Sequence, residues 1–250
     1  MPRYFLKLAY NGTIYHGWQI QDNAPSVQET INKAISIQIG SKINLSGCGR
    51  TDTGVHAREF YAHFDLEKSI DDREKFVFKL NSFLPSDIVL FDLIPVQAEA
   101  NTRFDAVSRT YEYQITRRKD PFRNDLAFTH FGNLEIDAMN NAAEILQEYT
   151  DFTSFSKLHT QVKTNNCKIM DASWKQEDDL LVFTITADRF LRNMVRAIVG
   201  TLLEIGKGKA TIEDIRNIIL AKDRSKAGFS VPAQGLFLTK IQYPETIFKS

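Results

Sequence analysis

Apolar and polar residues alternate along some stretches of the chain and follow helical spacing along others. Alternation predicts a strand over residues 3–10. Helical spacing predicts a helix over 27–38, where Ser26 and Glu29 have the spacing of a capping box and Gly40 is the stop signal. The same two periods predict the next elements, which are two strands that flank a loop at 47–57, the second ending at 66, then a helix over 76–84 and a strand over 88–96. The order of this first half is β-α-β-β-α-β.

The order β-α-β-β-α-β, typical of ferredoxin-like folds, then occurs a second time. The expected elements are strands at 110–116, 168–176, 180–187 and 235–243, and helices at 136–149, 191–206 and from 211 onward. The fold class is therefore predicted as α+β, with two similar ferredoxin-like, RRM-like halves and mainly antiparallel sheets. A catalytic cleft is expected between an N-terminal subdomain, 1–102, and a C-terminal subdomain, 103–250.

Composition narrows the class of protein. The chain has 250 residues, of which 43% are hydrophobic, and no apolar run reaches the length of a membrane span. Its N-terminus lacks the apolar region of a signal peptide, and two cysteines without a CxxC pair argue against a disulfide scaffold or a zinc site. We therefore expect a cytoplasmic protein. Lys plus Arg equals Asp plus Glu at 31 each. This balance weakens the case for a nucleic-acid-binding protein without excluding one, because binding needs only a local basic surface.

A glycine-rich loop spans residues 47–57 and carries Arg50 and Asp52 between its second and third glycines. Glycine lets a backbone turn sharply and approach a ligand closely, so the loop could present a catalytic carboxylate. The alternative is an Asx turn with a surface ion pair. The alternation at 59–66 predicts the strand that follows, with one face buried. An aromatic-rich loop at 15–19 either packs on the core or forms a wall for a flat ligand.

Arg196 falls beside Val199 and Leu203, at the edge of the apolar stripe of its predicted helix. A guanidinium there needs a carboxylate or a cleft, or else its head reaches water. Basic residues also gather near the expected join and alternate with aromatic ones. The basic residues are Arg103, Arg109, Arg117, Arg118, Lys119 and Arg123, and the aromatic ones are Phe104, Tyr111, Tyr113 and Phe122. This combination suits RNA phosphates and unstacked bases, although a solvated face is the alternative.

Six segments, in order along nearly the whole chain, resemble the signatures of one family. They are the YNG and YHGWQ segments from Tyr10, the GCGRTDTGVHA loop from Gly47, SRTYEY from Ser108, DFTSF from Asp151, FLRNMVR from Phe190 and GLFL from Gly235. The chain resembles the tRNA pseudouridine synthase A family. The resemblance implies isomerisation of uridine to pseudouridine at positions 38, 39 and 40 of the tRNA anticodon stem-loop. It also implies a homodimer without a metal or an organic cofactor.

The resemblance implies a role for each matching residue. Asp52 is the expected catalytic carboxylate, Arg196 its partner, and Arg50 the residue that helps extrude the target nucleotide. Tyr111 is expected to stack on the extruded uracil, and Leu236 to line the other side of the base. The expected phosphate contacts come from Arg103, Arg109 and Arg192.

Two other functions remain open from the residues alone. Cys48 could act as a nucleophile in a cysteine-dependent uridine-modifying enzyme, although no glycine-rich donor-binding loop follows a strand. We interpret Cys48 as a small buried residue. The second alternative is a non-catalytic RNA-binding module built from two RRM-like halves, which would not need Asp52.

Overall fold

The computed structural model describes residues 1–157 and 164–249. The chain divides into two compact units: unit 1 contains Met1–Val107 and Leu238–Ser250, and unit 2 contains Ser108–Phe237. The last strand leaves unit 2 after Phe237, and the residues that follow it belong to unit 1. The expected subdomains, 1–102 and 103–250, stay a prediction. No described helix is both long and apolar enough to cross a membrane.

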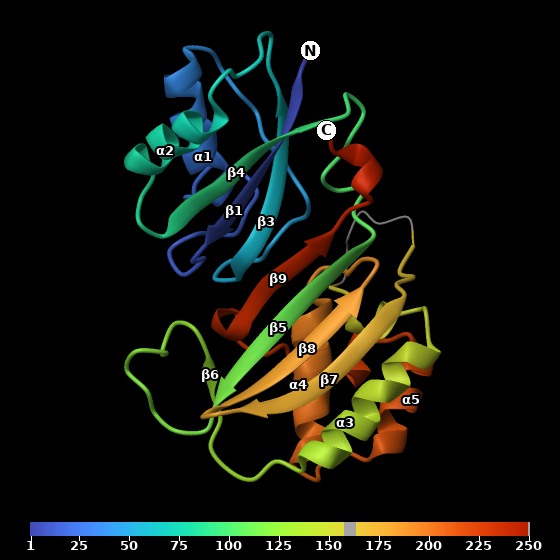
Figure 1. Ribbon diagram of the computed structural model, residues 1–250. Coiled ribbons are helices and arrows are strands. Elements are labelled where there is room, and N and C mark those ends of the chain that lie inside the picture. The colour runs from blue at the N-terminus through green and yellow to red at the C-terminus, as the bar shows by residue number, and fades with distance from the viewer. Residues whose placement is uncertain (158–163, 250) are drawn as a thin grey trace. The chain divides into compact units, whose positions relative to one another are not determined.

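Unit 1 contains an antiparallel sheet with two helices (Figure 1). β1 (Arg3–Tyr10) lies between β3 (His56–Asp65) and β4 (Ile88–Val96), and β2 (Ser46–Gly47) pairs with the other edge of β3. In chain order the elements are β1, α1 (Val27–Ile39), β2, β3, α2 (Arg73–Phe83) and β4. The predicted β-α-β-β-α-β order of the first half is therefore confirmed.

The ends of α1 follow the predicted signals with one difference. The Ser26 hydroxyl accepts a hydrogen bond from the Glu29 N–H at 3.3 Å, and Gly40 ends the helix with φ 77°. The Glu29 side chain instead forms an ion pair with Lys33 at 2.6 Å. The N-cap was thus predicted correctly, but the second bond of a capping box is replaced by a pair one turn along the helix.

The prediction that β3 buries only one face is wrong. Tyr61 and His63, on the face expected to be polar, are only 8% and 7% exposed. Tyr61 packs edge-on against Tyr243 with ring centroids 5.2 Å apart, and His63 bonds to Thr102 at 2.7 Å. Both covering residues lie far from β3 in the sequence, so local alternation could not predict this burial.

Within unit 2, β8 (Leu180–Ala187) pairs antiparallel with both β5 (Ser108–Thr116) and β7 (Ile169–Glu177). The two-residue strand β6 (Phe128–Thr129) runs parallel to β5. The α-helices in the described part of this unit are α3 (Ile136–Ile145), α4 (Met194–Gly206) and α5 (Ile212–Ala221) (Figure 1). α3 packs against β7, α4 and α5. The α+β class with mainly antiparallel pairing is therefore confirmed.

The remaining elements are short or span the division. β9 (Leu236–Gln242) begins in unit 2 and continues in unit 1. The described 3-10 helices are Leu146–Glu148, Thr153–Phe155, Arg224–Lys226, Ala233–Gly235 and Glu245–Ile247.

α4 begins three residues later than the apolar spacing predicts. Asn193 has a left-handed backbone with φ 67°, so the helix cannot extend back to Leu191. The Asn193 side chain donates to the Ser230 hydroxyl at 2.6 Å, which helps hold this conformation. A helical wheel does not contain this information, because the conformation depends on a residue 37 positions away.

Replacing Ser26 with Ala tests the N-cap of α1. The variant loses the side-chain acceptor for the Glu29 N–H, and its free energy of unfolding should fall by about 1 kcal/mol. For a chain of this size that corresponds to a fall in Tm of about 2–4 °C in a thermal melt. Ser82→Ala, which removes an exposed hydroxyl from α2, is the control and should change Tm less. Equal melting of Ser26→Ala and wild type would contradict the assigned cap.

Candidate active site

Asp52 lies on the loop between β2 and β3, at the start of a tight turn. Its carbonyl accepts the Val55 N–H at 3.1 Å, and Gly54 has φ 77°, a conformation that favours glycine. Asp52 is half-buried and Arg50 is exposed. The loop therefore holds the carboxylate on a constrained backbone and leaves the guanidinium accessible.

The loop at 10–18 supports the Asp52 loop by close backbone contact. A Cβ added at Gly17, where φ is 88°, would lie 2.2 Å from the Thr51 carbonyl oxygen. A Cβ at Gly12 would lie 2.0 Å from the Val55 carbonyl oxygen. Real Cβ atoms do not approach so closely, so any side chain at these positions would push the Asp52 loop away.

Hydrogen bonds complete this support. The Tyr10 hydroxyl bonds to the Thr51 hydroxyl at 2.9 Å, and the Gly54 N–H donates to the Tyr15 carbonyl at 3.2 Å. The Gly12 N–H donates to Nδ1 of His56 at 3.0 Å. Because Nδ1 accepts, neutral His56 carries its proton on Nε2. We call residues 10–18 with these contacts the cradle of the Asp52 loop.

Asp87 fixes the cradle to the turn before β4. The Tyr15 hydroxyl donates to Asp87 Oδ1 at 2.9 Å, and the Asn11 N–H donates to the Asp87 carbonyl at 2.8 Å. Burial, together with the neighbouring Asp87 carboxylate, raises the pKa of Tyr15, so the tyrosine stays protonated as the donor. Sequence reasoning missed this role of Asp87, because the two partners are 72 residues apart.

The aromatic residue of the cradle belongs to the core. Trp18 is 1% exposed and stacks on Phe60 with ring centroids 4.2 Å apart. Of the two interpretations of this loop, packing on the core is therefore confirmed for Trp18. Cys48 is also 1% exposed, which confirms its interpretation as a small buried residue. A thiol so buried lacks the accessibility that a nucleophilic cysteine needs.

Two of the predicted site residues of unit 2, Arg109 and Tyr111, lie near the start of β5, which pairs with the end of β8. The Tyr111 ring meets the Phe190 ring edge-on, with centroids 5.2 Å apart, and Arg109 donates to the Asp188 carbonyl at 2.8 Å. Nε of half-buried Arg196 donates to the Val231 carbonyl at 2.7 Å. The guanidinium at the edge of the apolar stripe thus has a backbone acceptor within its own unit.

Leu236 and Arg192 belong to the same unit. Leu236 is 6% exposed at the start of β9, whereas Arg192 is exposed just before α4. The predicted residues therefore form two sets. Unit 1 holds Asp52, Arg50 and Arg103, and unit 2 holds Arg109, Tyr111, Arg192, Arg196 and Leu236. The pairing of Asp52 with Arg196 joins the two sets and stays a prediction.

Potential metal ligands are dispersed. In the part of the chain that the structure describes, no three His, Cys, Asp or Glu side chains are grouped so that they could hold a metal ion.

The chain, with its constrained carboxylate loop on an α+β fold, is similar to known proteins. A family model described as tRNA pseudouridine synthase matches residues 142–244. Together with the relatives that follow, this match identifies the class, which is an isomerase acting on tRNA uridine.

Relatives extend the match over the whole chain. Each is a tRNA pseudouridine synthase A. The protein of Parabacteroides distasonis is 55% identical over 248 residues, which cover 99% of this chain and 98% of the relative. That of Porphyromonas gingivalis is 52% identical over 251 residues, covering 99% and 100%. That of Clostridium acetobutylicum is 42% identical over 240 residues, covering 95% and 98%. The chain belongs to the tRNA pseudouridine synthase A family.

Replacing Tyr15 with Phe tests whether the cradle positions the Asp52 loop. The variant removes one hydroxyl and its bond to Asp87, a hydrogen bond worth about 0.5–1.5 kcal/mol. If the bond acts on loop geometry, kcat for pseudouridine formation should fall roughly two- to tenfold, while KM for tRNA changes little. Steady-state kinetics measure both values.

Tyr149→Phe is the matched control, since its hydroxyl belongs to unit 2 and lies 3.5 Å from Arg216. It should leave kcat unchanged. An unchanged kcat in Tyr15→Phe would show that the bond to Asp87 has no part in positioning the loop.

Proposed function

We propose that this chain converts uridine to pseudouridine at positions 38, 39 and 40 of the tRNA anticodon stem-loop, with Asp52 as the catalytic carboxylate. The observation that carries the proposal is the support of the Asp52 loop. Two glycines of the cradle contact the loop closely, and Tyr10, Gly12 and Tyr15 form hydrogen bonds with it. Preorganisation of a carboxylate in this way is typical of a catalytic group. The likeness to tRNA pseudouridine synthase A proteins over nearly the full chain supports the same function.

The reaction breaks the N1–C1′ glycosidic bond, rotates the uracil and joins C5 to C1′. C5 then loses its proton to water, and N1 gains one, so the reaction is an isomerisation. Asp52 can act in two ways. Its carboxylate can attack C1′, or it can remove a sugar proton to give a glycal. Either route needs an ionised carboxylate, which is why a cationic partner matters.

Arg196 is the proposed partner of Asp52, and its bond to the Val231 carbonyl supports a fixed orientation of the guanidinium. The target base must leave the stem to expose its sugar, which costs a few kcal/mol that protein contacts offset. Exposed Arg50 is the proposed extruding residue, since it can reach the RNA from the loop that carries Asp52. We place the uracil between the Tyr111 ring and Leu236, with Arg103, Arg109 and Arg192 on phosphates.

Two similar halves, a homodimer and a cytoplasmic location belong to the same proposal. Unit 2 supports the first point, because β5, α3, β7, β8, α4 and the strand β9 that begins in it follow the order β-α-β-β-α-β once the two-residue β6 and the additional helix α5 are set aside. We assign the carboxylate loop to the N-terminal subdomain, 1–102, and the residues that complete the cleft to the C-terminal subdomain, 103–250.

Replacing Asp52 with Asn separates the proposed enzyme from the alternatives. Pseudouridine is mapped on tRNA transcripts by carbodiimide treatment and primer extension, and tRNA binding is measured in parallel. Wild type should convert uridines at 38, 39 and 40. Asp52→Asn should reduce conversion by about 10³-fold or more while binding persists, because only the reacting carboxylate is changed. Asp71→Asn, an exposed carboxylate change in the same unit, should behave as wild type.

Three results would contradict the proposal. Full activity of Asp52→Asn, with loss only in Cys48→Ala, would support the cysteine-dependent enzyme. Binding without conversion by wild type would support the non-catalytic RNA-binding module. Conversion of uridines elsewhere in the tRNA, but not at 38, 39 or 40, would overturn the assigned positions.

A further inference from the structure

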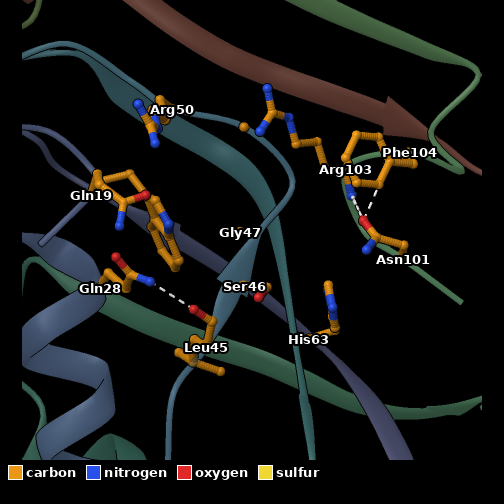
Figure 2. A pocket seen from close by; sticks show the side chains of 12 residues that line it. Gln19, Gln28, Leu45, Ser46, Gly47, Arg50, His63, Asn101, Arg103 and Phe104 are labelled. Carbon is orange, nitrogen blue, oxygen red and sulfur yellow. Dashed lines mark hydrogen bonds between the residues drawn. The ribbon is translucent and has the colours of Figure 1, made fainter. Parts of the chain in front are cut away.

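Unit 1 contains a pocket of about 260 Å³ beside the Asp52 loop. Figure 2 shows Gln19 on the side opposite Asn101 and Phe104, with Ser46 and Gly47 between them. Gly49 and Arg50 of the Asp52 loop also line the pocket. Asp52 itself is not among the described residues that line it, so the pocket is a neighbour of the reacting carboxylate rather than its site.

The pocket walls suit an anion with hydrogen-bond acceptors. Arg50 and Arg103 supply two cations, and none of the described lining residues carries a carboxylate. The carboxylate of Asp105 is nearby, but it accepts the Asn101 N–H at 2.7 Å. It therefore belongs to the turn that carries Asn101 and Arg103. Burial and the charge of Arg3 lower the pKa of His63, which therefore lines the pocket as a neutral group near pH 7.

Phe104 gives the pocket a flat aromatic face. The residue is 75% exposed, and the guanidinium carbon of Arg103 lies 5.5 Å from its ring centroid. Asn101 Oδ1 accepts the N–H groups of Arg103 and Phe104 at 2.9 and 3.2 Å. The Asn101 side chain thus fixes the turn that presents the ring, and its NH₂ group is the donor end.

Thr102 connects the turn that carries Asn101, Arg103 and Phe104 to the rest of unit 1. The Thr102 hydroxyl donates to the Ser46 carbonyl at 3.0 Å and lies 2.7 Å from Nδ1 of His63. The Thr102 carbonyl accepts the Tyr243 hydroxyl at 2.6 Å. An exposed aromatic ring on a turn fixed in this way is preorganised for stacking, because little conformational entropy remains to be lost on binding.

We propose that this pocket holds one unpaired nucleotide of the tRNA close to the target uridine, with its phosphate between Arg50 and Arg103 and its base on Phe104. The inference rests on the proposed function. The volume lies just below the lower limit of about 300 Å³ for small-molecule pockets, which fits one nucleotide and not a paired stem. Because Arg50 is two residues from Asp52, the occupant is a near neighbour of the target in the same strand.

The first test measures RNA affinity without requiring catalysis. Stacking of one base on an aromatic side chain is worth about 1–3 kcal/mol, so Phe104→Ala should raise Kd for an anticodon stem-loop RNA by about tenfold. Phe104→Tyr, which keeps the flat ring, should bind as wild type does. Phe78→Ala is the matched control, since Phe78 is 74% exposed on α2 of the same unit, and its Kd should not change.

The second test identifies the occupant. Stem-loop RNAs are made with a single abasic site, placed in turn at each position flanking the target. At one position the abasic RNA should already have lost the stacking energy, so Phe104→Ala should add no further penalty there. At the other positions the tenfold penalty should remain.

Two results would overturn the proposal: an unchanged Kd in Phe104→Ala, or the same penalty on every abasic RNA. Failure of the proposed function would look different. In that case wild type would form no pseudouridine in the intact stem-loop RNA, while the Kd values with the same RNAs would still decide what occupies the pocket.

Discussion

The close contact between two backbone segments is the constraint on which the rest of the candidate site depends. The Asp52 loop has few large side chains of its own that could hold it, and it is held instead by the cradle. Gly12 and Gly17 allow the two backbones to touch, and Tyr15 links the cradle to Asp87. A catalytic carboxylate gains from such support, because its orientation is set before the substrate arrives.

Much of the fold could be predicted from local patterns. β1, α1 and β8 end within a residue of the positions that apolar spacing and stop signals indicate. Two of the errors share one physical cause, which is contact between residues distant in sequence. The covered face of β3 depends on Tyr243 and Thr102, and the late start of α4 accompanies a bond from Asn193 to Ser230. No local period carries that information.

The residues of the candidate site likewise fall into those that a local sequence pattern marks and those that only contacts between distant residues reveal. The glycine-rich spacing around Asp52 marks the loop, and the basic and aromatic pair at 103–104 marks one wall of the pocket. His63 and Ser46 could not be placed beside that wall from the sequence, because Thr102 joins them to it across more than 35 residues. Asp87 carries no motif at all, and only its bond to Tyr15 shows its role.

In the proposed reaction Asp52 enables a bond to form at C5 of uracil. The most direct measurement is the release of tritium from tRNA labelled at uracil C5, in buffer without added cofactors, by wild type and by Asp52→Ala under single-turnover conditions. Wild type should release tritium and the variant should not. Equal release from both would remove Asp52 from the mechanism.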